Sequence, residues 1–104
     1  MYILKSFRRS KYDILFDILE LLLKNYKKTH IIYLLNLNHK ILEKYLNYMI
    51  KKNLIQPLNF ERTSFMVTKR GWEALKKWQE LKKIIENDEK FIKFDDSSLV
   101  IYEI

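Results

Sequence analysis

The sequence predicts a mainly α-helical fold with one small β-hairpin and an extended last helix. Three observations lead to this fold class. The 104 residues contain one glycine and one proline, Gly71 and Pro57, and the scarcity of these breakers favours helices. Apolar residues recur at helical spacing in four segments. Two short apolar stretches, residues 54–58 and 65–67, flank a polar segment, which is typical of a hairpin. The length fits a single domain.

The first helix is expected to begin at Ser10 and to run to about Tyr26. Ser10 and Asp13 stand three residues apart and can form a capping box, in which each side chain accepts from a free N–H group. Beyond one narrow polar stripe the helix is apolar, so it must be covered on more than one side. In a domain this small, that requirement suggests a partner subunit. Residues 1–9 are expected to form an arm or a strand.

The second and third helices follow a short basic connector. We expect Thr29 to cap a short helix over residues 30–35, and residues 36–38 to form a tight turn. Asn38 then caps a third helix that runs to about Lys52. The outward face of this third helix carries polar side chains at helical spacing: Lys40, Lys44, Asn47 and Lys51.

The fourth helix is expected over residues 69–87, with Thr68 as its cap. An apolar seam with spacings of four, three and four residues is typical of a coiled coil. The acidic cluster at residues 86–89 opposes the helix dipole and is expected to end the helix. Residues 88–104 are expected to form an acidic tail that could fold as a second hairpin or pair with residues 2–7. The seam consists of Ala74, Trp78, Leu81 and Ile85.

The order of these elements is that of a winged helix-turn-helix over residues 10–68, followed by a dimerisation helix over residues 69–87. A short helix, a three-residue turn and a basic helix make the helix-turn-helix, and the hairpin behind them makes the wing.

Three segments resemble a known family in their order and spacing. They are KKTHIIYLLNLN (27–38), KYLNYMIKKNLI (44–55) and VTKRGWEAL (67–75). They are similar to the small winged-helix DNA-binding proteins of crenarchaea and their viruses, which dimerise through a C-terminal coiled coil. The resemblance implies a homodimer that binds double-stranded DNA in the cytoplasm of an archaeal or virus-infected cell. Pro57, the wing without glycine and both termini depart from the family pattern.

The charge distribution favours the same kind of partner. Residues 1–83 contain 18 Lys and Arg against 7 Asp and Glu, a net charge of +11, whereas residues 84–104 carry −4 from 2 against 6. A basic body on a small protein indicates a polyanionic partner. We therefore expect duplex DNA binding, either as a transcription regulator or as a chromatin-type protein. The alternative from another class is a winged helix that mediates protein–protein assembly without DNA.

The third helix is expected in the major groove, where its lysines would bind phosphates or guanine and Asn47 could pair with adenine. Base contacts concentrate at the N-terminus of such a helix, which points to Asn38 and His39, although Asn38 can also be a plain cap. Arg62 at the wing tip could enter the minor groove, and the adjacent Glu61 argues against this role. At the second helix, Lys27, Lys28 and Thr29 could clamp a phosphate; the alternative is a plain cap with two surface lysines.

The apolar seam of the fourth helix is the expected dimer interface, with Trp78 as its anchor because a buried tryptophan removes the most apolar area. The alternative is that Trp78 and Leu81 pack on the first helix of their own subunit and leave a monomer.

Several functions are not indicated. The sequence has no cysteine, and His30 and His39 have no clustered carboxylate, so no metal site is expected. There is no phosphate-binding glycine loop and no nucleophile with a partner base. No apolar run is long enough to span a bilayer. We expect no enzyme activity, no cofactor, no membrane association and no small-molecule substrate.

Overall fold

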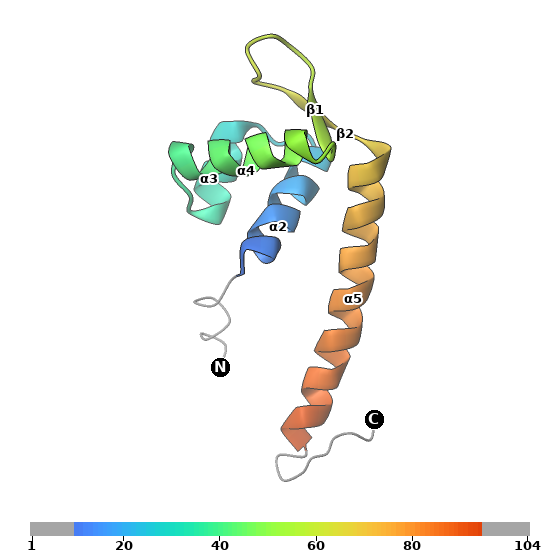
Figure 1. The fold of residues 1–104 in the computed structure, drawn as a ribbon. Coiled ribbons are helices and arrows are strands. Elements are labelled where there is room, and N and C mark those ends of the chain that lie inside the picture. Colours follow the sequence, from blue (N-terminus) through green and yellow to red (C-terminus); the bar gives the residue numbers. More distant parts are fainter. Residues whose placement is uncertain (1–9, 95–104) are drawn as a thin grey trace.

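The computed structural model describes residues 10–94, with side chains for residues 10–86. Three helices come first, then a hairpin, then a long helix (Figure 1). Expectations for residues 1–9 and 95–104 lie outside the described residues. The elements are α2 (Lys11–Leu23), α3 (Lys28–Leu35), α4 (His39–Lys51), β1 (Ile55–Pro57), β2 (Phe65–Val67) and α5 (Lys69–Phe94).

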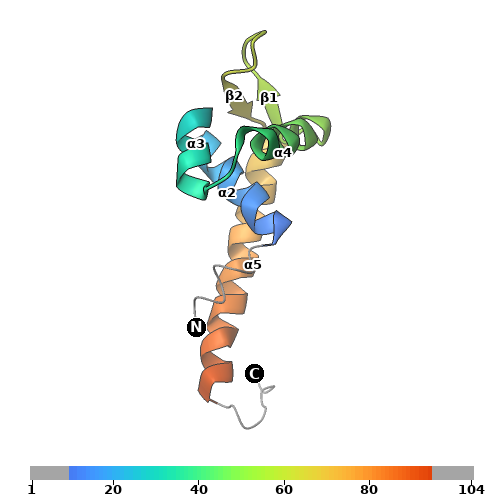
Figure 2. The same ribbon diagram turned by 90° about the vertical axis from the view of Figure 1, so that its left-hand side faces the viewer.

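The arrangement confirms the predicted fold class. Helices α2, α3 and α4 form a compact body, and the hairpin projects from one end of it (Figures 1 and 2). Helix α5 starts beside the hairpin, packs along α2 and continues beyond the body. The structure is therefore a winged helix-turn-helix with an extended C-terminal helix.

Helix α2 begins at the predicted capping box. The Asp13 N–H donates to Ser10 Oγ at 3.1 Å, and the Ser10 N–H donates to Asp13 Oδ2 at 3.0 Å. The helix ends at Leu23, earlier than the expected Tyr26. Asn25 adopts a left-handed φ of 68°, which no helical residue can have, and this stops the helix.

The buried core lies around α2, which supplies four of its ten apolar side chains. Helix α3, α4, the hairpin and α5 supply the others. The second side of α2 is thus covered by α5 and the hairpin of the same chain, so the apolar character of this helix does not by itself require a partner subunit. The ten residues are Leu15, Ile18, Leu19, Leu22, Ile31, Leu42, Leu46, Met49, Ile55 and Leu75.

Helix α3 begins two residues earlier than expected. Its first helical hydrogen bond runs from the Ile31 N–H to the Lys27 carbonyl, so Lys27 is the N-cap. Thr29 lies inside the first turn and its predicted capping role is wrong. The helix ends at Leu35, and Asn36, with a φ of 56°, starts the tight turn predicted for residues 36–38. Asn38 then caps α4 as predicted, since its side-chain Oδ1 accepts from the Ile41 N–H at 2.8 Å.

The hairpin pairs β1 with β2 in antiparallel register, with Ile55 opposite Val67 and Pro57 opposite Phe65. Pro57 is the last residue of β1, a position at the end of an edge strand where a missing N–H is tolerated. We call residues 55–67 the wing.

The start of α5 is bonded directly to the end of α4. Thr68 caps α5 as predicted, because its Oγ accepts from the Gly71 N–H at 3.0 Å. The same hydroxyl lies 2.8 Å from the Asn53 carbonyl and 3.1 Å from the Leu54 carbonyl. In addition, Arg70 Nε in the first turn of α5 donates to the carbonyl of Lys52, the residue that follows α4, at 3.0 Å. We call these contacts the α4–α5 junction.

Helix α5 runs to Phe94. The prediction that it ends at the acidic cluster of residues 86–89 is therefore wrong. The dipole penalty falls on the last turn only, and residues 86–89 lie more than a turn before the end. Residues 91–94 are helical and cannot contribute a strand to a second hairpin. None of the helices in the described part of the chain is long and apolar enough to cross a membrane.

Candidate nucleic-acid interface

Helix α4 presents a polar face to solvent because its fully buried apolar residues point the other way, while Ile41 and Tyr48 at the margins are 40% and 44% exposed. Leu42, Leu46 and Met49 are fully buried against the body. The four side chains predicted to face outward are all exposed, and they lie on the opposite side of the helix at spacings of four, three and four residues. We call this set the polar face of α4: Lys40, Lys44, Asn47 and Lys51.

The N-terminus of α4 lies at one end of this face. His39 is exposed in the first turn, whereas Asn38 uses its side-chain oxygen to cap the helix. The amide nitrogen of Asn38 remains as a donor, so capping and ligand contact are compatible at this residue.

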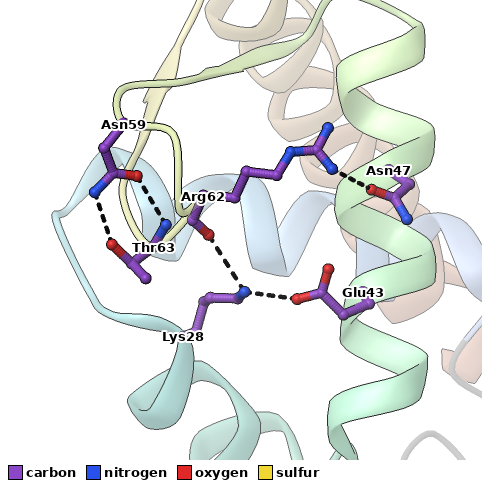
Figure 3. Close-up of polar contacts among 6 residues, drawn as sticks. All are labelled: Lys28, Glu43, Asn47, Asn59, Arg62 and Thr63. Atoms are coloured by element: carbon purple, nitrogen blue, oxygen red, sulfur yellow. Dashed lines mark hydrogen bonds and ion pairs between the residues drawn. The ribbon is translucent and has the colours of Figure 1, made fainter.

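The wing is connected to the polar face through Arg62. Its Nη1 donates to Asn47 Oδ1 at 3.2 Å, and the guanidinium therefore extends over α4 (Figure 3). Two residues predicted separately, one on the helix and one on the wing, thus lie together. Arg62 also has a left-handed φ of 59°, a conformation that costs a non-glycine residue about 1 kcal/mol or more.

The wing loop is closed by a second set of hydrogen bonds. Asn59 Oδ1 accepts from the Thr63 N–H at 2.9 Å, and Asn59 Nδ2 donates to Thr63 Oγ1 at 2.7 Å (Figure 3). The Arg62 N–H donates to the Asn59 carbonyl at 3.1 Å. These bonds fix the loop without a glycine.

Lys28 joins α3, α4 and the wing. Its Nζ lies 2.6 Å from Glu43 Oε2 and donates to the Arg62 carbonyl at 3.3 Å (Figure 3). The Lys28 side chain is only 20% exposed. Of the three residues expected to clamp a phosphate, Lys27 and Thr29 are exposed, and Lys28 is occupied by contacts within the chain.

The apolar seam of α5 is divided between the body and solvent. Trp78 is half-buried and stacks on Phe16 of α2, with ring centroids 4.7 Å apart. Ala74 is also half-buried, whereas Leu81 and Ile85 are 47% and 53% exposed. The N-terminal half of the seam, Ala74 and Trp78, thus packs against its own chain, and the C-terminal half, Leu81 and Ile85, is exposed to solvent.

Several exposed apolar residues were not singled out from the sequence, and two of them lie on the wing and on α5. Phe60 at the wing tip is 98% exposed, and Ile84 on α5 is 59% exposed. An aromatic residue inside the polar segment 59–64 was the available signal for Phe60. Within the described residues, no group of three His, Cys, Asp or Glu side chains could hold a metal ion.

Comparison with known proteins agrees with this geometry. No curated protein and no solved structure matches the chain. A family model described as winged helix-turn-helix matches residues 8–86, which include α2, α3, α4, the wing and most of α5. Because the match covers most of the chain and the observed elements follow the same order, the chain belongs to the winged helix-turn-helix family.

Proposed function

We propose that the protein binds double-stranded DNA with α4 in the major groove and regulates transcription. Membership of the winged helix-turn-helix family suggests DNA binding. The observation that carries the finer proposal is the polar face of α4, with three lysines and an asparagine exposed together. A major groove about 12 Å wide admits one α-helix.

Each side chain on this face has a chemical role in such a complex. Lysine ammonium groups bind phosphates or the acceptor edge of guanine, and an asparagine amide can pair with adenine. Asn47 now accepts from Arg62, and in the complex this pair would open or act together at the groove edge. His39 and Asn38 would lie near base edges at the N-terminus of the helix.

We further propose that two copies associate through α5 as a homodimer with a coiled-coil contact. Leu81, Ile84 and Ile85 are exposed on the part of α5 that extends beyond the body (Figures 1 and 2). Since Trp78 packs on Phe16, the interface is centred on Leu81 and Ile85 and not on Trp78. A two-fold dimer would place two α4 helices on two half-sites.

The resemblance to crenarchaeal and viral winged-helix proteins supports the remainder of the proposal. On this basis we propose that the protein binds DNA in the cytoplasm of an archaeal or virus-infected cell, as a binding protein without catalytic activity.

Binding should depend steeply on salt if phosphate contacts dominate. With five or six cationic contacts in the complex, the logarithm of the association constant should fall against log salt with a slope of roughly −5. Gel-shift titration of a mixed-sequence duplex at two or more salt concentrations measures this slope. No binding at low salt, or an affinity that salt does not change, would refute DNA binding.

The polar face is tested by changing Lys40 and Lys44 together to alanine. Both are exposed, so circular dichroism should remain unchanged while the affinity falls by more than about tenfold. Lys77→Ala with Lys83→Ala removes the same charge from exposed positions on α5 and is the matched control. Equal losses from both pairs would show that overall charge, and not α4, determines binding.

A further inference from the structure

The wing ends in a single, almost fully exposed aromatic ring. Phe60 is 98% exposed, the highest value among the large apolar side chains of the described residues. Burial of this exposed phenylalanine ring by a partner would be favourable. The loop that carries it is held by the Asn59–Thr63 hydrogen bonds and by the bond from Lys28 to the Arg62 carbonyl (Figure 3). The ring is therefore presented by an ordered loop.

The wing's chemistry differs from that of α4. Residues 55–67 contain one cation and one anion, Arg62 and Glu61, and so carry no net charge. Its other exposed side chains include Leu58 at 60% and Met66 at 44%. Phosphate attraction through the wing is consequently weak, and any contact it makes is mainly apolar.

The position of Phe60 relative to α4 is set by Arg62. The Cα atoms of these two residues are at most about 7–8 Å apart, because only two peptide units separate them. Arg62 in turn bonds to Asn47 in the middle of the polar face. A duplex seated on that face would therefore bring its neighbouring groove to the wing tip.

We propose that Phe60 inserts between two base pairs of the bound duplex and bends it. Apolar side chains inserted from the minor groove unstack a base step and kink the helix by about 20–90°. The ring gains burial that it lacks in the free protein, and Arg62 beside it can bind the groove floor or a phosphate. This inference rests on the proposed DNA binding and adds bending to it.

The test uses the full chain and a mixed-sequence duplex of about 26 base pairs with two TpA steps, which unstack most easily. In one set of duplexes 2-aminopurine replaces the adenine of one step, so that its fluorescence rises on unstacking. In a second set, donor and acceptor dyes at the two ends report bending by energy transfer. Binding is measured in parallel by gel shift.

The unaltered protein should raise both signals. Phe60→Ala should abolish both while weakening binding by less than about tenfold, since the α4 contacts remain. Phe60→Leu should retain much of both signals, because leucine can also act as a wedge. Tyr33→Ala is the control: Tyr33 is an aromatic residue of α3 with 82% exposure, and its loss should change neither signal.

Two results would overturn the proposal and leave DNA binding intact. The first is tight binding by the unaltered protein with no rise in either signal. The second is a Phe60→Ala variant that bends and unstacks DNA as well as the parent, which would assign the exposed ring to a protein or membrane partner. If the unaltered protein binds no duplex at low salt, both the proposed DNA binding and the proposed insertion of Phe60 are refuted.

Discussion

Gly71 lies where the start of α5 packs closely against Leu54, which follows α4. A Cβ atom at this position would collide with the carbonyl oxygen of Leu54 and lie 3.1 Å from a Val67 methyl carbon. That carbonyl also accepts from the Thr68 N–H at 3.0 Å, so the backbone cannot move away without losing a bond. The only glycine of the chain is therefore required by close approach and not by an unusual φ.

Gly71→Ala should consequently lower the free energy of unfolding, even though alanine is the better helix former by about 1 kcal/mol. Forcing an atom into a packed site costs about 1–3 kcal/mol, and here the obstacle is backbone, so we expect a net loss of about 2 kcal/mol. Urea denaturation measures it. Gln79→Ala at an exposed site of the same helix should stay within about 0.5 kcal/mol of the parent. A Gly71→Ala variant as stable as the parent would contradict the close approach.

Lys28 and Lys40 carry the same charge but have different surroundings. Lys28 bonds to Glu43 and to the wing, whereas Lys40 is exposed on the polar face. Lys28→Gln should lower the free energy of unfolding by about 0.5–1 kcal/mol and leave the salt slope of DNA binding nearly unchanged. Lys40→Gln should leave the free energy of unfolding nearly unchanged and reduce the salt slope by about 1 for each bound subunit. Urea denaturation and gel-shift titration of both variants measure the two effects. A reduced salt slope for Lys28→Gln would show that Lys28 contacts DNA.

The exposure of the polar face of α4 was predicted correctly, because it depends on helical periodicity. The spacing of Lys40, Lys44 and Lys51 was enough to place them on one exposed face. The link from Arg62 to Asn47 was not predictable, because it joins residues 15 apart through the folded position of the wing. The pairing of Lys28 with Glu43 is of the same kind.

At the scale of elements, three helices end in the same way. Asn25, Asn36 and Asn53 follow α2, α3 and α4, and each has a left-handed φ between 56° and 68°. This conformation usually requires glycine, and asparagine is the residue that tolerates it best after glycine. A chain with one glycine therefore ends its helices with asparagine.

Replacing Asn53 tests this role. Asn53→Ala should lower the free energy of unfolding by about 1 kcal/mol, because the alanine Cβ is strained at φ 61°. Asn53→Gly should be close to neutral, since glycine adopts the same φ without strain. Thermal or urea denaturation compares the two variants. Equal losses from both would show that the asparagine side chain, and not its backbone conformation, is needed.

The sequence predicted helix starts better than helix ends. Ser10, Asn38 and Thr68 cap their helices through bonds to residues three positions away, which are visible in the sequence. The end of α2 depends on the φ of Asn25, and the length of α5 depends on continuation past the acidic cluster. Neither has a comparably local signal. The covering of α2 by its own chain was missed because it is set by tertiary packing.

At the scale of the whole molecule, α5 extends well beyond the body, since its 26 residues span about 39 Å. Leu81→Glu with Ile85→Glu should convert a dimer into a monomer in light scattering, because charges are then placed in an apolar contact. Stability of each subunit should change little, as both side chains are exposed in the single chain. A monomeric mass for the unaltered protein at tens of micromolar would refute the dimer.

Trp78→Ala tests whether this side chain stabilises the subunit or the dimer interface. Its ring stacks on Phe16, so its loss should lower the free energy of unfolding by about 2 kcal/mol while the dimer persists at low temperature. Dissociation without loss of subunit stability would place Trp78 in the interface after all.

The α4–α5 junction has a consequence for the DNA sequence itself. Thr68, Arg70 and Gly71 fix the direction of α5 relative to α4 with no flexible linker between them. If two α5 helices hold the dimer, the two α4 helices stand at a set distance and rotation. Each base pair inserted between half-sites turns one of them by about 34–36° around the duplex axis. The operator should therefore tolerate base changes in its spacer but not changes in spacer length, and one added or removed base pair should weaken binding more than any single spacer substitution.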